Sequence, residues 1–203
     1  MRLLLTAVVL CLPLVACGKS EIAPEVGPAP VAVASEAESQ PNITEGQELL
    51  FVTGSLDEAL LKSGWSSPED HGTWSQAPEA TILLSLPPTL VNKKVALDFV
   101  VTAFTDGKVP KQVVTISAND AEVGQWTFEH AHEQNGNRSV ELPEGLIKAS
   151  MPLTLKFSMS AATSPSSLGI GADTRQLGVH LRSLKLRTPI DTAPSGTPNG
   201  SAN

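Results

Sequence analysis

The sequence predicts an all-β domain, a jelly-roll-like β-sandwich of about eight short strands. Apolar residues recur at every second position in several stretches, which is the period of a strand with one buried face. Turn-forming residues separate these stretches. The segment from Glu48 to Thr188 is near the usual size of one domain and is long enough to bury a core.

The expected strands follow one another from the start of this segment to its end. Asn119-Asp120 is expected to form a hairpin turn, because both residue types tolerate a positive φ. The last strand changes phase at Arg182-Ser183, as a β-bulge requires. One or two helical turns are expected at 55–63 and again at 144–149. The expected strands are 49–52, 82–86, 95–103, 113–118, 123–128, 140–142, 153–159 and 177–186.

Composition divides the chain into four parts. Residues 1–16 have the charged, apolar and small-residue zones of an export signal. Residues 17–47 are rich in Pro, Ala and Glu without apolar periodicity, which predicts a semi-extended tether. Residues 48–188 are the expected sandwich domain, and the apolar-poor tail 189–203 is predicted to be disordered.

The start of the chain resembles that of bacterial lipoproteins. Arg2 precedes an apolar run, 3–16, that is too short for a membrane-spanning helix. Leu14-Val15-Ala16-Cys17 resembles a lipobox, which implies cleavage before Cys17 and a diacylglycerol on its sulfur. Gly18 follows in place of the Asp that retains lipoproteins at the inner membrane. The expected location is therefore the periplasmic face of the outer membrane, with the inner membrane as the alternative.

Charge and cysteine content exclude several classes of protein. With Cys11 removed and Cys17 lipidated, the mature chain has no disulfide and depends on its core. The chain has a net charge of −7, so it does not have the excess of basic residues that is typical of a nucleic-acid-binding protein. Aromatic residues make up 4% of the chain, which argues against a broad aromatic platform for sugars but leaves room for one or two stacking residues.

Three blocks together resemble an uncharacterised β-sandwich module that is appended to bacterial membrane proteins handling envelope polysaccharides. Those proteins include glycosyltransferase-like and phosphoglycerol-transferase-like ones, and the module is similar to galactose-binding-like, carbohydrate-binding jelly rolls. The resemblance covers roughly 48–187, and it implies the fold more specifically than the function. This chain departs from the pattern in its Asn-Asp hairpin, where Asn-Gly is usual, and in standing alone on a tether. The blocks lie at 64–75, 124–128 and 164–184.

The first candidate site is the polar loop that carries Trp65 and Trp74. An exposed indole stacks on a sugar ring, while Glu69, Asp70 and His71 between the two indoles offer hydrogen bonds to hydroxyls. In the alternative interpretation both indoles cover the core and the polar residues are solvated loop.

The second candidate site is Asp173 with Arg175, just before the last strand. A guanidinium can bind a carboxylate or phosphate through two hydrogen bonds. If the two loops meet in space, Arg175 faces Glu69 or Asp70. In the alternative interpretation the pair only holds the loop in place.

A third pattern, His130-Ala131-His132, places two imidazoles on one face of a strand, as two metal ligands should lie. Isolated His-x-His is a weak metal signal, so we favour an exposed loop and expect neither metal nor cofactor.

Known enzyme signatures are missing from the sequence, which favours a protein that binds without catalysis. The leading hypothesis is a membrane-anchored periplasmic module that binds an envelope or exported glycan. The alternative is an accessory subunit that docks onto a membrane polysaccharide-handling complex through protein contacts.

Overall fold

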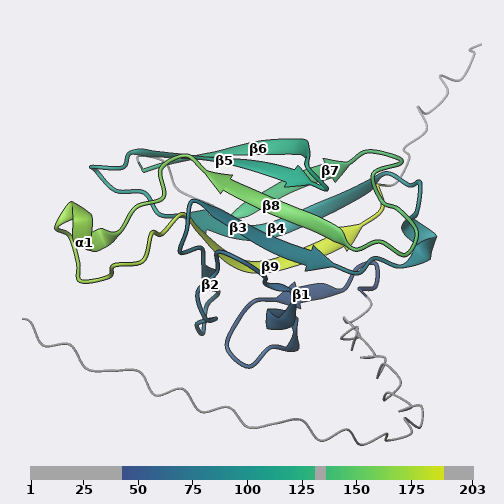
Figure 1. Cartoon of the computed structure of the whole chain (residues 1–203), viewed down its shortest axis with the longest axis horizontal. Helices are drawn as coiled ribbons and strands as arrows, with labels where there is room; N and C mark the ends of the chain where they lie inside the picture. The colour runs from purple at the N-terminus through teal and green to yellow at the C-terminus, as the bar shows by residue number, and fades with distance from the viewer. Residues whose placement is uncertain (1–42, 131–135, 190–203) are drawn as a thin grey trace, which may run out of the picture. The chain divides into compact units, whose positions relative to one another are not determined.

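Alternation of apolar and polar residues produces two antiparallel sheets in the computed structural model, which describes residues 43–130 and 136–189. Figure 1 shows the sheets as two stacked layers. The five-stranded sheet has the order β1-β9-β4-β7, with β2 paired to β9, and the four-stranded sheet has the order β3-β8-β5-β6. The strands are β1 (Glu48–Leu50), β2 (Thr73–Trp74), β3 (Glu79–Leu84), β4 (Val95–Ala103), β5 (Lys111–Ala118), β6 (Ala121–Glu129), β7 (Asn137–Leu142), β8 (Leu153–Met159) and β9 (Val179–Arg187).

The strand order confirms the predicted jelly roll. With the two-residue β2 set aside, the five-stranded sheet contains the first, eighth, third and sixth strands of the remaining eight. The four-stranded sheet contains the second, seventh, fourth and fifth, which completes the jelly-roll order. Three short helical segments join the strands: η1 (Leu56–Leu60), η2 (Pro88–Leu90) and α1 (Pro165–Leu168). Within the described residues, no helix has the length and apolar character that crossing a membrane requires.

The core lies between the sheets and centres on a cluster of aromatic rings. Phe157 on β8 packs edge to face against Trp65 and Phe99, with centroid distances of 5.8 and 5.9 Å. Trp126 on β6 contacts both phenylalanine rings. The indole of Trp126 also donates a hydrogen bond to the Ser139 carbonyl on β7, 3.3 Å away, and so links the sheets on that side. The cluster therefore joins residues of both layers.

The predicted hairpin and the predicted bulge are both confirmed. Asn119 and Asp120 have φ angles of 46° and 67°, and they close the two-residue turn between β5 and β6. On β9, Ser183 pairs with Val100 while Leu181 pairs with Val101, so Arg182 is the extra residue. The bulge keeps the apolar side chains of β9 facing the core on both sides of the phase change.

Local predictions hold for one helical segment and fail for the other. The turn expected at 55–63 is η1, whose first residues are capped by the Ser55 side chain. The helical turns expected at 144–149 are wrong, because that segment forms turns and bends. Pro143 precedes it, and Gly145 and Ser150 take left-handed φ angles of 79° and 57° that interrupt a helix. Strand β2 and the helical segments α1 and η2 were not predicted from the sequence.

Both ends of the described domain meet at one end of the sandwich. Ile43 is buried in the core, so the packing begins ahead of the expected domain boundary at Glu48. The Glu45 carboxylate accepts hydrogen bonds from the backbone amide of Thr188, at 2.9 Å, and from its hydroxyl. Residues near the two ends of the described domain are therefore held together. The expected signal, tether and tail, including Cys17, lie outside the described residues.

Candidate functional site

The loop that carries the two candidate tryptophans folds as an irregular hairpin around β2. Trp65 forms a bridge with Ser75, and Glu69 forms another with Gly72. Trp65 follows the alternative interpretation, in which the indole covers the core, because it packs in the aromatic cluster and the residue is only 7% exposed. The Trp65 indole donates a hydrogen bond to the Thr81 carbonyl, 2.9 Å away, which satisfies its one polar atom inside the protein.

Trp74 has the opposite orientation, because Thr73 and Ser75 on either side of it are buried. It lies half-buried on the outer face of the five-stranded sheet, directly opposite His180 on β9. The Trp74 and His180 rings are 4.7 Å apart at an interplanar angle of 39°. Burial is the main cause of a lowered pKa for His180, so this imidazole is held in its neutral form. The pair presents an uncharged, partly exposed aromatic surface.

Arg175 joins the two predicted loops. Its Nη1 lies 2.8 Å from Glu69 Oε1, and its Nη2 lies 2.6 Å from Asp173 Oδ2. The side-chain hydrogen bonds from Arg175 hold the pKa of Asp173 below its usual value. The loops therefore meet as the sequence suggested, with Glu69 as the partner. The guanidinium donates hydrogen bonds to both carboxylates, and this ion pair fixes the two loops against each other. His71 and Asp70 are exposed beside it.

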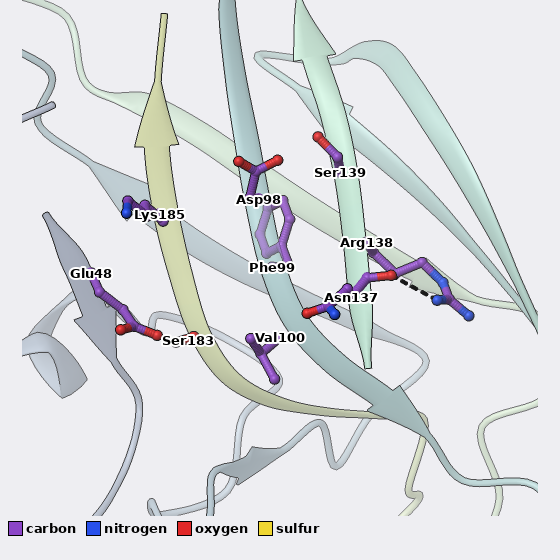
Figure 2. Close-up of a pocket in the computed structure, with 9 residues that line it drawn as sticks. All are labelled: Glu48, Asp98, Phe99, Val100, Asn137, Arg138, Ser139, Ser183 and Lys185. Carbon is purple, nitrogen blue, oxygen red and sulfur yellow. Dashed lines mark hydrogen bonds between the residues drawn. The ribbon is translucent and has the colours of Figure 1, made fainter. Parts of the chain in front are cut away.

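A hollow of about 440 Å³, which was not predicted from the sequence, lies on the outer face of the five-stranded sheet (Figure 2). Its polar side chains come from four adjacent strands, because Glu48 pairs with Lys185, Lys185 with Asp98, and Asp98 with Ser139. We call this the sheet hollow. It is lined by Glu48, Asp98, Phe99, Val100, Asn137, Arg138, Ser139, Ser183 and Lys185.

Small side chains form the floor of the sheet hollow. Ser183 and Val100 pair across β9 and β4, next to the longer side chains of Lys185 and Asp98. Figure 2 shows Asp98 and Ser139 side by side on neighbouring strands, with Asn137 near Val100. The hollow thus combines a partly apolar floor with several hydrogen-bonding groups, which is the usual make-up of a small-molecule site.

Asp98 in the hollow is held in place by Arg187. Arg187 Nε lies 2.5 Å from Asp98 Oδ2, and its Nη2 lies 3.3 Å from Oδ1. This contact is the main cause of a lowered pKa for Asp98, which therefore remains a carboxylate at neutral pH. Fixed in this way, Asp98 offers acceptor oxygens in a defined position. It does not have the raised pKa that a general acid requires.

The histidines of the third pattern do not make a metal site in the part of the chain that is described. His130 is exposed at the end of β6, and His132 lies outside the described residues. Among residues 43–130 and 136–189, no three or more His, Cys, Asp or Glu side chains are grouped to hold a metal ion.

Comparisons with known proteins find distant structural neighbours. No protein-family model matches the chain, and no curated protein matches it. Dimeric latent PorU from Porphyromonas gingivalis is similar at a TM-score of 0.40 and 14% identity, over 75% of this chain and 13% of that one. The acetyl xylan esterase Est2A from Butyrivibrio proteoclasticus is similar at a TM-score of 0.29 and 12% identity, over 72% of this chain and 32% of that one. This chain spans less than a third of the length of either protein.

Proposed function

We propose that this chain is a lipid-anchored, non-catalytic binding module of the bacterial cell envelope that recognises a glycan in the sheet hollow. The observation that carries the proposal is the row of carboxylate, ammonium and hydroxyl groups across four strands, beside a small apolar floor. Sugars offer many hydroxyls, which donate to carboxylates and accept from ammonium groups. Val100 on the floor suits the apolar C–H face of a sugar ring.

A binding role fits the electrostatics of the hollow better than a catalytic one. Glycoside hydrolysis needs one carboxyl group with a raised pKa to protonate the leaving group. The Arg187 guanidinium lowers the pKa of Asp98, and Lys185 lies between Asp98 and Glu48 in the cross-strand row. A carboxylate with a lowered pKa, such as Asp98, serves recognition, because it stays ionised near neutral pH and has no proton to donate.

Removal of one carboxylate from the sheet hollow tests the proposal that the hollow binds a glycan. We expect Asp98→Ala to weaken binding to purified envelope polysaccharides by about tenfold or more, since a hydrogen bond to a charged group contributes roughly 1.5–3 kcal/mol. Calorimetric titration of the full chain measures the affinity, and thermal unfolding checks that the variant folds. Glu79→Ala is the matched control, because it removes a carboxylate from a cross-strand ion pair with Lys156 on the other sheet.

The proposal is contradicted if no envelope polysaccharide binds, or if folded Asp98→Ala and Glu79→Ala proteins bind as tightly as the unaltered chain. A protein partner captured at the same face in the absence of glycan would favour the accessory-subunit hypothesis instead.

The lipid anchor has its own test. We expect Cys17→Ser to move the protein from the membrane fraction to the soluble periplasmic fraction, because the thioether to diacylglycerol needs the sulfur. Fractionation of outer and inner membranes, followed by immunoblotting, gives the location of both forms. Cys11→Ser is the control, since Cys11 lies inside the expected signal. Equal membrane recovery of all three proteins would argue against lipidation.

A further inference from the structure

Strand pairing aligns the outward side chains of the five-stranded sheet in three parallel rows, which run across the strands. The charged row contains Glu48, Lys185, Asp98 and Ser139. The small row contains Leu50, Ser183, Val100 and Asn137. The aromatic row contains Trp74, His180 and Thr102. The sheet hollow covers the charged row and most of the small row, and the aromatic row follows next along β4.

Together the three rows extend farther along β4 than a single sugar ring can cover. Asp98, Val100 and Thr102 occupy alternate positions of β4, so neighbouring rows are about 7 Å apart and the outer two are about 14 Å apart. The bulge at Arg182 lets His180 and Ser183 face outward in the same series, although they are three residues apart. An extended ligand parallel to β4 and β9 would therefore contact all three rows.

Along β4 the rows pass from charged side chains to small ones and then to aromatic ones, and this sequence of contacts suits a chain of sugars. Polar groups gather in the charged row, and the small row forms the floor with Val100 and Ser183. At the far end, the Trp74 indole lies against His180 and offers a partly exposed ring for stacking. In the charged row Glu48 lies opposite Lys185, and Asp98 forms an ion pair with Arg187, so the positive and negative charges here balance. Balanced charges offer no net attraction for an anionic ligand, and the whole chain is acidic.

We infer that the three rows form one elongated site for a neutral, linear oligosaccharide, which lies along β4 and β9 with one sugar ring against Trp74. The inference rests on the proposed function and adds to it the length, direction and charge of the ligand. It also makes Trp74 a distal contact, which only a ligand longer than the hollow reaches.

Titration of the full chain with cello-, malto- and chito-oligosaccharides of increasing length tests this inference, with oligogalacturonates as the anionic series. We expect affinity for at least one neutral series to rise with chain length and then level off. Trp74→Ala should weaken binding of the longest oligomers about tenfold, equivalent to about 1.4 kcal/mol, and leave the shortest oligomer that binds unaffected. Asp98→Ala should weaken binding at every length. Met151→Ala, a substitution of another exposed apolar residue away from the rows, should change nothing.

Three results would overturn the inference while glycan binding itself stands. These are an affinity that does not depend on chain length, a Trp74→Ala loss that is absent or equal at all lengths, and tighter binding of oligogalacturonates than of any neutral series. No binding by any polysaccharide or oligosaccharide would overturn both the inference and the proposed function. Near-UV circular dichroism of Trp74→Ala shows whether the remaining indoles keep their native packing.

Discussion

Replacing Phe157 with alanine is expected to lower the free energy of unfolding by about 3–5 kcal/mol. The ring is 1% exposed and contacts Trp65, Phe99 and Trp126, which come from both layers of the sandwich and from the loop before β2. Its removal leaves a cavity that two hydrogen-bonded sheets cannot collapse to fill. Since domains of this size are stable by about 5–15 kcal/mol, the variant should lose a large fraction of its stability.

Urea denaturation followed by tryptophan fluorescence measures this loss, because two of the three indoles contact Phe157. Leu56→Ala is the control, since Leu56 is 88% exposed and its truncation should change stability by less than about 0.5 kcal/mol. Similar midpoints for Phe157→Ala and Leu56→Ala would show that the aromatic cluster is not the centre of the core.

Gly64→Ala is expected to destabilise the protein by about 3 kcal/mol or more, because it adds a steric clash to backbone strain. Gly64 has a φ of 80°, and a Cβ there would lie 2.0 Å from the Glu79 carbonyl oxygen of β3. That oxygen belongs to the backbone of a paired strand, so it cannot move aside without disturbing the sheet. The approach of residue 64 to β3 also sets the position of Trp65 in the core.

Gly46→Ala separates the steric clash from the backbone strain. Gly46 has the same φ of 80°, but a Cβ at that position meets nothing within 4 Å. The control should therefore lose only the cost of the left-handed conformation, about 1 kcal/mol. The difference between the two urea midpoints measures the clash, and equal midpoints would mean that the chain at residue 64 can move away from β3.

Strands were predictable from the sequence where the residues of one strand alone determine its position. Leu153, Leu155, Phe157 and Met159 have the period of a strand with one buried face, and β8 has the predicted bounds. The phase change at Arg182 was visible for the same reason. Strand β2 was not predictable in this way, because two residues are too few to show a period.

The candidate site was harder to predict, because it depends on contacts between distant segments. Trp65 and Trp74 lie in similar polar surroundings in the sequence, yet hydrogen bonding to Thr81 directs one indole inward while strand pairing directs the other outward. The residues of the sheet hollow look like ordinary outward positions of four separate strands. Only the register between those strands places Asp98 beside Lys185 and Ser139, and a single sequence does not encode register visibly.

The contact between Glu45 and Thr188 has a practical consequence for engineering. A unit whose entry and exit points touch can be spliced into a surface loop of an unrelated host without forcing the two sides of that loop apart. The segment from Ile43 to Pro189 is therefore suited to transplantation as a cassette.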